Sequence, residues 1–415
     1  MADYPSKTKV WEFARKIARQ CGQLIKSTWL IIGATLLLIL FLNGAVSLIY
    51  RLQPAKTGSA YFPHSHFFQK APWSQDYEKE LVTSYNTSWR PFVYWRRLPF
   101  KGKYININAQ GLRYTTPGAP VKSEGSPNLK IFMFGGSTMW GEGVRDQYTL
   151  ASLVSRNLAS HQIKAKVTNF GEVAYVNTQE LIELIFQLER GNVPNVVIFY
   201  DGYNDVYAAE QDHVAGLSQF EWKRKIEYNI SSRYNKLKKV FLLNTLDQFA
   251  LGKLIKSLST KLSYQTPFSQ VSKTLEKDII EVYLNNIKII TALGKAYGFV
   301  PVFFWQPVIY TKNTLTASEK PYAAEPLGEL YRQSHAFMKA NADQFAPYNF
   351  YDISGLFADA KDEVYMDFCH VNEDANRLIA RRITADLLQV LKAHPSLGRR
   401  EVSGGTATGG LAAPR

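Results

Sequence analysis

Short apolar runs that alternate with helix-like segments constrain the fold of this 415-residue chain more than any other feature. The runs hold too few polar residues to present one face to water, so each is expected to form a strand buried on both faces of a sheet. They lie at 131–134, 166–170, 196–200 and 300–304, with a weaker one at 350–353. The helix-like segments lie near 148–160, 177–190, 275–297, 324–343 and 373–393. This pattern predicts an α/β fold, a doubly wound parallel sheet whose ligands bind beyond the carboxyl ends of the strands.

An uncharged and mostly apolar segment at 27–50 separates a basic N-terminus from the rest of the chain. About 20 helical residues cross a hydrocarbon core, so a transmembrane helix is predicted at 29–50. Six lysines and arginines and only two acidic residues precede it, which predicts a cytoplasmic N-terminus at 1–28. The remainder would be extracytoplasmic, and periplasmic in a Gram-negative cell. A cleaved signal peptide with its site at 45–47, or a buried core helix, would be the alternatives.

The sequence on either side of the first strands suggests further divisions. Residues 51–127 are rich in aromatic residues and prolines, and we interpret them as a stalk and flap. Their rings would either stack on sugars or pack against the domain and the membrane interface. The α/β domain is expected at 128–395, with a helical insertion at 211–274, and the tail at 396–415 is expected to be disordered.

The insertion at 211–274 is strongly basic, with ten lysines and arginines between residues 221 and 262. One interpretation is a lid that also contacts anionic lipid or an acidic polymer. The other is a cap whose charges are merely solvated. The net charge of +14 for the whole chain favours negatively charged partners, although no nucleic-acid partner is expected.

Cysteine usage argues against a metal or a redox centre. The chain has two cysteines, which cannot form a disulfide framework, and neither lies at a structural-zinc spacing from a second ligand. We therefore expect no metal site. Hydrophobic residues make up 46% of the chain, enough for a buried core, so wholesale disorder is not expected.

Residues suited to catalysis follow three of the predicted strands. The first strand runs into two glycines and Ser137, and the glycines permit a tight turn that exposes the serine hydroxyl at the edge of the sheet. The second strand ends at Gly171, whose N–H can approach a substrate oxygen closely, and the third is followed by the amide of Asn204. With the Ser137 N–H, these two donors are predicted to form an oxyanion hole, although each segment alone is also typical of a loop.

An aspartate and a histidine precede the last predicted helix. Asp367 lies three residues before His370, so its carboxylate can accept from one ring nitrogen while the other nitrogen takes the Ser137 proton. The alternative is a surface turn that caps the helix starting near Asn372. Cys369 lies between the two and is interpreted as a small buried hydrophobic residue.

Taken in order, these blocks resemble the Ser-Gly-Asn-His, or GDSL-type, hydrolase family. The resemblance covers roughly residues 129–393, and its blocks are matched at 135–138, 171, 202–205 and 367–370. It implies a three-layer, flavodoxin-like α/β fold, no cofactor, and ester hydrolysis or acyl transfer. Gly136 stands where the family name has an aspartate, which should leave the nucleophile intact but weakens any inference to lipases.

The sequence therefore predicts a membrane-anchored, extracytoplasmic serine esterase. Ser137 would be the nucleophile, His370 the base and Asp367 the residue that orients the base. The expected substrate is an O-acylated envelope polysaccharide or a related glycan. An O-acyltransferase with the same three residues and a non-catalytic, glycan-binding envelope scaffold are the alternatives.

Overall fold

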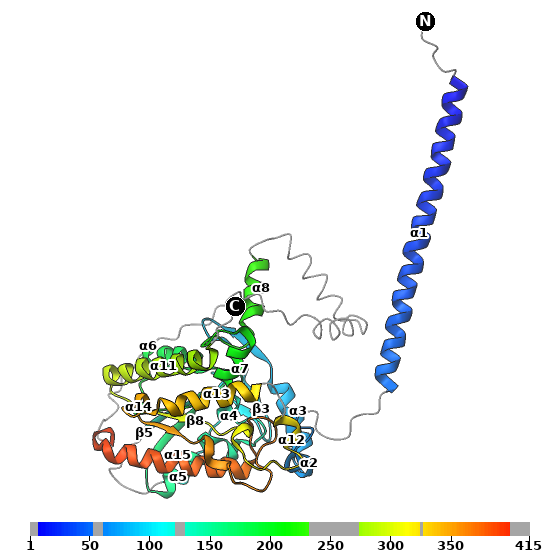
Figure 1. The fold of residues 1–415 in the computed structure, drawn as a ribbon. Coiled ribbons are helices and arrows are strands. Elements are labelled where there is room, and N and C mark those ends of the chain that lie inside the picture. The colour runs from blue at the N-terminus through cyan, green and yellow to red at the C-terminus, as the bar shows by residue number, and fades with distance from the viewer. Residues whose placement is uncertain (1–6, 53–60, 121–128, 232–273, 324–326, 399–415) are drawn as a thin grey trace. The chain divides into compact units, whose positions relative to one another are not determined.

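The computed structural model places the chain in two compact units. One unit comprises residues 1–56 and 225–265, and the other comprises residues 57–224 and 266–415. The described residues are 7–52, 61–120, 129–231, 274–323 and 327–398 (Figure 1). Most of the insertion predicted at 211–274 and most of the tail predicted at 396–415 lie outside them, so the lid and the disorder stay predictions.

The core of the larger unit is a five-stranded sheet in the order β6-β5-β7-β8-β9, with every neighbouring pair parallel. The strands are β5 (Leu129–Gly135), β6 (Ala165–Asn169), β7 (Val196–Asp201), β8 (Val300–Trp305) and β9 (Phe350–Asp352). Each overlaps one of the five apolar runs. Every residue of β7 is buried, as a central strand covered on both faces requires.

Helices cover both faces of this sheet, which gives three layers (Figure 1). On one face α5 (Leu150–Ser160) packs against α15 (Glu373–Ala393). On the other face α11 (Leu275–Tyr297) contacts α6 (Asn177–Glu189) and α13 (Leu327–Ala340), and α7 (Tyr203–Asp212) contacts α11 and α13. The predicted three-layer, doubly wound α/β fold is confirmed.

Two of these helices begin at side-chain caps that the sequence contains. Thr149 accepts a hydrogen bond from the Ser152 N–H at the start of α5, and Asn372 accepts one from the Ala375 N–H at the start of α15. Such caps satisfy N–H groups that the first helical turn leaves without an intrahelical partner. They explain why both helices start within two residues of the positions that the sequence predicts.

The order of the strands determines where a ligand can enter. From β5 the chain passes to β6 on one side and then to β7 on the other side of β5. The connections from β5 and β7 therefore diverge at the carboxyl end of the sheet, and ligands of doubly wound sheets bind at such a switch point. Ser137 follows β5 and Asn204 follows β7, so both lie at this point.

Residues 61–107 form short elements beside the sheet. They are α2 (His66–Lys70), α3 (Ser74–Ser84), an antiparallel pair of β1 (Thr87–Arg90) and β2 (Tyr94–Arg97), and a second antiparallel pair of β3 (Phe100–Lys101) and β4 (Asn106–Ile107). Many of their rings join a second hydrophobic cluster that includes Trp140 and Met366. Most aromatic residues predicted for a flap thus pack against the domain. Trp89 and Phe92 are the more exposed ones, at 68% and 71%, although the Phe92 ring centre lies 6.0 Å from that of Phe186 in α6.

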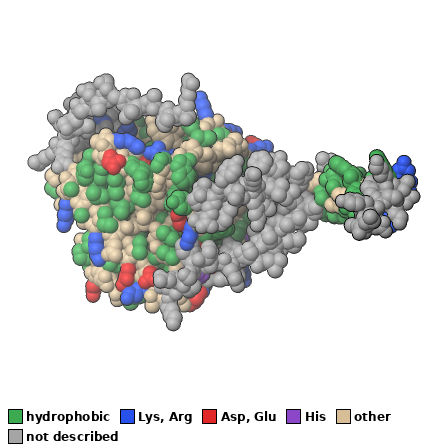
Figure 2. Space-filling model, turned by 90° about the horizontal axis from the view of Figure 1, so that it is seen from above, with side chains coloured by type: hydrophobic (Ala, Val, Ile, Leu, Met, Phe, Trp, Pro, Cys, Tyr) green, Lys and Arg blue, Asp and Glu red, His purple; other side chains and the backbone are tan. Residues whose placement is uncertain are grey.

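The remaining short elements connect the larger ones. They are α4 (Ser137–Trp140), α8 (Glu221–Ser231), α12 (Lys320–Ala323), α14 (Ala342–Phe345), and four 3-10 turns at Asp146–Tyr148, Ile309–Thr311, Ser354–Phe357 and Pro395–Gly398. The face of the molecule seen in Figure 2 carries patches of apolar side chains among scattered charged ones.

The N-terminal unit contains α1 (Lys7–Leu52), one continuous helix that begins well before the predicted span at 29–50. The stretch at 15–49 is long and apolar enough to cross a membrane. None of the residues in its most apolar 18-residue stretch is buried within the structure. Side chains such as Trp29 and Phe41 are about 70% exposed or more. This exposure does not fit the core-helix alternative, and both a membrane span and a signal sequence fit it.

Candidate active site

Ser137 is held at the start of a one-turn helix that leaves its N–H and hydroxyl at the edge of the sheet. Strand β5 ends at Gly135, whose φ of 158° is at the limit of what a side chain tolerates, and Gly136 is the N-cap of α4. As the first helical residue, Ser137 has an N–H without an intrahelical acceptor. That N–H donates no hydrogen bond to another described residue, so it is available to a ligand.

A hydrogen-bonded chain connects Ser137 to the loop before α15. The Ser137 Oγ lies 2.8 Å from His370 Nε2, and His370 Nδ1 lies 2.7 Å from Asp367 Oδ2. Ser137 is 7% and His370 5% exposed. The structure therefore brings together the three residues, separated by up to 233 positions, that the sequence predicted as nucleophile, base and orienting acid.

The loop that carries the histidine is closed by its own backbone. Asp367 Oδ1 accepts the N–H groups of Cys369 at 2.9 Å and of His370 at 2.7 Å. The Met366 N–H donates to the His370 carbonyl at 2.8 Å. These bonds fix the carboxylate relative to the ring, so the imidazole is oriented before any ligand binds.

The electrostatics of this loop favour a charged imidazole. Burial by itself would lower the pKa of His370, but the carboxylate of Asp367 raises that pKa well above its ordinary value. Burial raises the pKa of the Cys369 thiol to about 12, so this thiol is neutral near pH 7. Asp367 is therefore the negative charge that stabilises the imidazolium.

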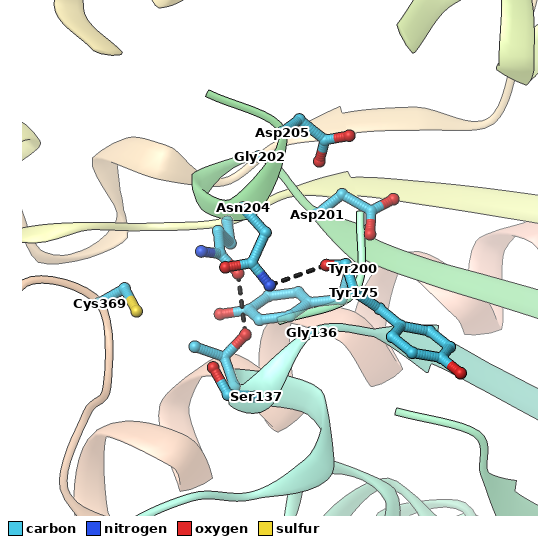
Figure 3. Close-up of a pocket in the computed structure, with 11 residues that line it drawn as sticks. Gly136, Ser137, Tyr175, Tyr200, Asp201, Gly202, Asn204, Asp205 and Cys369 are labelled. Carbon is cyan, nitrogen blue, oxygen red and sulfur yellow. Dashed lines mark hydrogen bonds between the residues drawn. The ribbon is translucent and has the colours of Figure 1, made fainter. Parts of the chain in front are cut away.

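Asn204 faces Ser137 across a small pocket at the ends of β5 and β7 (Figure 3). Its Nδ2 donates one hydrogen bond to the Tyr175 carbonyl at 2.8 Å, and its Oδ1 accepts one from Gln219 Nε2 at 3.2 Å. These two bonds orient the amide, and the second hydrogen of the Nδ2 group remains for an oxygen at Ser137.

Gly136 makes room for that amide. A Cβ atom built on Gly136 would lie 2.1 Å from Asn204 Nδ2, closer than any van der Waals contact allows. The absence of an aspartate at this position, noted from the sequence as a departure, thus has a steric reason in this chain. Asn204 occupies the space that the side chain would need.

Gly171 does not join this group. Its N–H donates to Asn169 Oδ1 at 2.9 Å, and a Cβ atom there would lie 2.5 Å from the Trp140 nitrogen. Gly171 is thus required for close packing against α4, and its N–H already has a partner. The structure does not support its predicted place in an oxyanion hole.

A neighbouring residue has a backbone that sequence reasoning missed. Ala174 has a left-handed φ of 65°, an unusual conformation for a residue with a side chain, and it precedes Tyr175, which lines the pocket. The Ala174 N–H donates no hydrogen bond to a described residue. An alanine in a sequence does not indicate this conformation. The oxyanion-hole donor was therefore predicted at Gly171, three residues earlier.

Three buried acids lie behind Asn204, and the sequence analysis did not identify them. Glu180, Asp201 and Asp205 are at most 8% exposed, and Asn177 donates to the last two, from Nδ2 to Asp201 at 2.7 Å and from N–H to Asp205 at 3.1 Å. The Asp201 and Asp205 carboxyl groups point away from Ser137 (Figure 3). Burial, reinforced by the neighbouring carboxylates, raises the pKa of Glu180 well above its ordinary value.

The acid cluster should make the protein less stable as the pH rises. Burial raises the pKa of Asp201 to about 8 and that of Asp205 to about 6. The folded protein therefore binds protons that the unfolded chain releases above pH ~4. The stabilisation that these carboxyl groups provide is complete below pH ~4. It is lost as the pH rises through their pKa values in the folded protein.

The variant Asp201→Asn keeps the shape of the side chain but cannot ionise. We expect its melting temperature to depend less on pH between about 5 and 8 than that of the unchanged protein. Asp343→Asn, at an exposed position, is the matched control. Equal slopes for the Asp201 variant and the unchanged protein, measured by thermal unfolding across this range, would contradict the expectation.

The segment at 61–113 packs against both elements of the candidate site. The guanidinium groups of Arg97 and Arg113 each lie 4.3 Å from the centre of the Trp140 ring in α4. Glu363, just before the histidine loop, accepts hydrogen bonds from Ser65 Oγ at 2.6 Å and from the N–H groups of the next two residues. Such surrounding contacts hold catalytic side chains in a productive geometry.

Two other groups of side chains have some features of a catalytic or metal site. Ser354 and Asp352 both contact the Nε2 atom of His335, at 2.9 and 2.8 Å, so the ring cannot relay a proton between them. Asp367, Cys369 and His370 have potential ligand atoms within 4.8 Å of one another. Both ring nitrogens of His370 are hydrogen-bonded there, one to Asp367 and the other to Ser137.

No family model matches the sequence, and no curated protein matches it. Among solved structures, an esterase from Pseudoalteromonas sp. is 13% identical, with a TM-score of 0.36, covering 64% of this chain and 100% of that chain. A catalytic mutant of an acetylxylan esterase from Geobacillus stearothermophilus is 12% identical, with a TM-score of 0.36, covering 63% of this chain and 94% of that chain.

A third similar structure is a member of the lipolytic protein G-D-S-L family from Veillonella parvula. It is 14% identical, with a TM-score of 0.34, and the match covers 63% of this chain and 98% of that chain. The function of the present chain is therefore inferred from its own side chains.

Proposed function

We propose that this protein is a serine esterase in which Ser137 is the nucleophile, His370 the general base and Asp367 the residue that orients and stabilises the base. One observation carries the proposal: the continuous hydrogen-bonded chain from Ser137 Oγ through both ring nitrogens of His370 to the Asp367 carboxylate. This arrangement activates a hydroxyl that is otherwise a weak nucleophile.

In the first half of the reaction, His370 Nε2 takes the proton of Ser137 as Oγ bonds to the ester carbonyl carbon. The carbonyl oxygen becomes an oxyanion, which the Ser137 N–H and the Asn204 amide are positioned to bind, with the Ala174 N–H as a third candidate donor. The bond between that carbon and the alcohol oxygen then breaks. His370 returns its proton to the leaving alcohol, and an acyl group stays on Ser137.

In the second half, water replaces the alcohol. His370 removes a proton from water, the resulting hydroxide attacks the acyl carbon, and the carboxylic acid leaves as Ser137 regains its proton from His370. The atoms of this half balance with water as the co-reactant. Asp367 keeps its negative charge throughout, and it stabilises the imidazolium in both halves.

We further propose that the esterase is membrane-anchored and acts outside the cytoplasm on an O-acylated envelope polysaccharide or a related glycan. Residues 15–49 of α1 are apolar enough to anchor it, and the basic residues before them favour a cytoplasmic N-terminus. The exposed rings of Trp89 and Phe92 could stack on sugars of such a glycan.

Labelling with a fluorescent fluorophosphonate tests the nucleophile directly. A serine without a neighbouring base does not react with this probe, whereas a serine activated by a histidine does. We expect the full-length protein in detergent to be labelled at Ser137, and Ser137→Ala to be unlabelled. Ser354→Ala removes the serine whose histidine cannot relay a proton, and it should be labelled like the unchanged protein. Absence of labelling in the unchanged protein would reject the esterase and favour a non-catalytic role.

A further inference from the structure

The amide of Asn204 must point in one direction to act as an oxyanion donor. The pocket beside Ser137 has a free volume of about 10 Å³, room for one water-sized group, so a carbonyl oxygen bound there cannot move to follow a displaced donor. The terminal torsion of an asparagine side chain has broad energy wells, and a single hydrogen bond leaves the amide able to rock about it. A second bond is therefore needed to fix the donor.

Tyr175 and Gln219 supply these two bonds at opposite ends of the amide. The Tyr175 carbonyl can only accept, so the Nδ2 atom of Asn204 must face it, at 2.8 Å. The Oδ1 atom then faces Gln219, whose Nε2 donates to it at 3.2 Å. Gln219 is 5% exposed and is not among the residues that line the pocket. It therefore reaches the site through Asn204.

Gln219 is fixed by the segment that carries it. Its carbonyl accepts from Arg224 Nη1 at 2.6 Å, and the N–H of the next residue, Phe220, donates to Gln211 Oε1 at 3.0 Å. The segment leaves α7 at His213 and enters α8 after Phe220, and both residues have left-handed φ values, 52° and 58°, which are uncommon where a side chain is present. The segment therefore lies against α7, and Gln219 cannot turn away without losing these contacts.

Both partners of the amide are also attached to β2. The Arg224 guanidinium lies over the rings of Tyr94 and Trp95, at 4.2 and 4.9 Å from their centres. The Tyr175 hydroxyl donates to the Trp95 carbonyl, and the centres of these two rings lie 5.5 Å apart in an edge-to-face arrangement. Strand β2 therefore holds the residues on either side of Asn204 at a set separation.

We propose that Gln219 is a positioning residue for the oxyanion donor, and that the start of the insertion expected at 211–274 is therefore part of the catalytic apparatus. This role depends on the proposed esterase function. By donating to Oδ1, Gln219 keeps the second hydrogen of the Asn204 Nδ2 group directed at the carbonyl oxygen of the ester. Donors that are oriented beforehand stabilise the oxyanion most, because they need not reorganise as the charge forms. This role differs from both the lid and the solvated cap that the sequence suggested.

Two substitutions of Gln219 test the role. Gln219→Met keeps the length of the side chain but cannot donate, and Gln219→Glu keeps its shape but presents a carboxylate that repels Asn204 Oδ1. Removal of a whole oxyanion donor costs about 10²- to 10³-fold in kcat. For p-nitrophenyl acetate and the full-length protein in detergent, we expect kcat to fall about 10-fold in Gln219→Met and about 10²-fold in Gln219→Glu. The ratio kcat/KM should fall by the same factors, because the contact acts only in the transition state.

A double substitution shows whether Gln219 acts through Asn204. Asn204→Ala removes the donor itself, so adding Gln219→Met to it should cost less than about twofold more. A residue that only stabilised the fold would lower kcat by the same factor in both backgrounds. Gln333→Met is the matched control, because Gln333 is exposed on α13 and donates to Glu329, and its kinetics should equal those of the unchanged protein. Thermal unfolding would verify that each variant is folded, and either Gln219 variant carries the test if the other does not fold.

Three results would overturn this role and leave the esterase function standing, because Ser137 would still be labelled by the phosphonate. They are a kcat within about twofold of the unchanged protein in the folded Gln219 variants, an equal loss with and without Asn204, and an effect confined to KM. Failure of the unchanged protein both to hydrolyse the ester and to be labelled at Ser137 would instead reject the esterase, and the role of Gln219 with it.

Discussion

Replacing Asp367 by asparagine is expected to lower kcat for ester hydrolysis by about 10⁴-fold while leaving the loop intact. Asparagine keeps an oxygen that can accept the N–H groups of Cys369 and His370, as Asp367 Oδ1 does now. It cannot supply the negative charge opposite His370 Nδ1, and its amide group favours the wrong tautomer of the ring. The variant thus separates the charge of Asp367 from its structural role.

The same variant should change the pH dependence of the rate. The reaction needs neutral His370, whose pKa Asp367 raises well above the ordinary value, so the rate of the unchanged protein should climb only at pH values above about 6.5. Without the carboxylate the pKa falls, and the rising limb of kcat/KM should move to lower pH.

Asp374→Asn is the control for this experiment, because Asp374 is exposed and lies one turn beyond His370, where it pairs with Arg377. It should leave both the turnover and the pH profile unchanged. A loss of less than about 10-fold in Asp367→Asn, or a limb that stays in place, would mean that Asp367 does not act on His370 as proposed.

Replacing Gly136 by alanine is expected to lower kcat by about 10²-fold or more. The φ of −77° at this position suits any residue, so the backbone itself is not strained by the change. The new Cβ atom would lie 2.1 Å from Asn204 Nδ2 and would displace the amide from the pocket. The loss would therefore report the contribution of the Asn204 donor without any change to Ser137, His370 or Asp367.

Gly355→Ala serves as the matched control, since a Cβ atom on that exposed glycine would meet nothing within 4 Å. Both variants should unfold at similar temperatures, and only Gly136→Ala should lose turnover. Its phosphonate labelling should also slow, because the phosphoryl oxygen of the probe uses the same donors. Turnover in Gly136→Ala within about threefold of the unchanged protein would exclude Asn204 as an important donor.

The sequence predicted most of the sheet because its signal is local and strong. Each apolar run became a strand within a few residues, and Ser137 and Asn204 follow β5 and β7 as the pattern required. The pairing of Ser137 with His370 over 233 positions was also anticipated, because the carboxyl ends of parallel strands and the loops beyond them meet at one edge.

The prediction for Gly171 failed for a reason that a sequence cannot reveal. A glycine permits close approach, but whether its N–H points to a substrate or to a neighbouring side chain depends on the path of the turn. Here the side chain of Asn169, two residues earlier, accepts the Gly171 N–H. The backbone of Trp140 in α4 occupies the space beside Gly171. The acids behind Asn204 were missed because Glu180, Asp201 and Asp205 are ordinary polar residues until three elements bury them together.

By itself, the sequence determined the parallel sheet, the positions of the residues proposed as nucleophile and base, and a helix apolar enough for a membrane. Apolar periodicity and the residues that end each strand express these features locally. Only the tertiary structure decided which donors remain available at Ser137, how strongly Asp367 acts on His370, and how little room the pocket leaves. Those properties depend on distances of a few ångströms between segments that are distant in the chain, and burial sets the strength of each interaction.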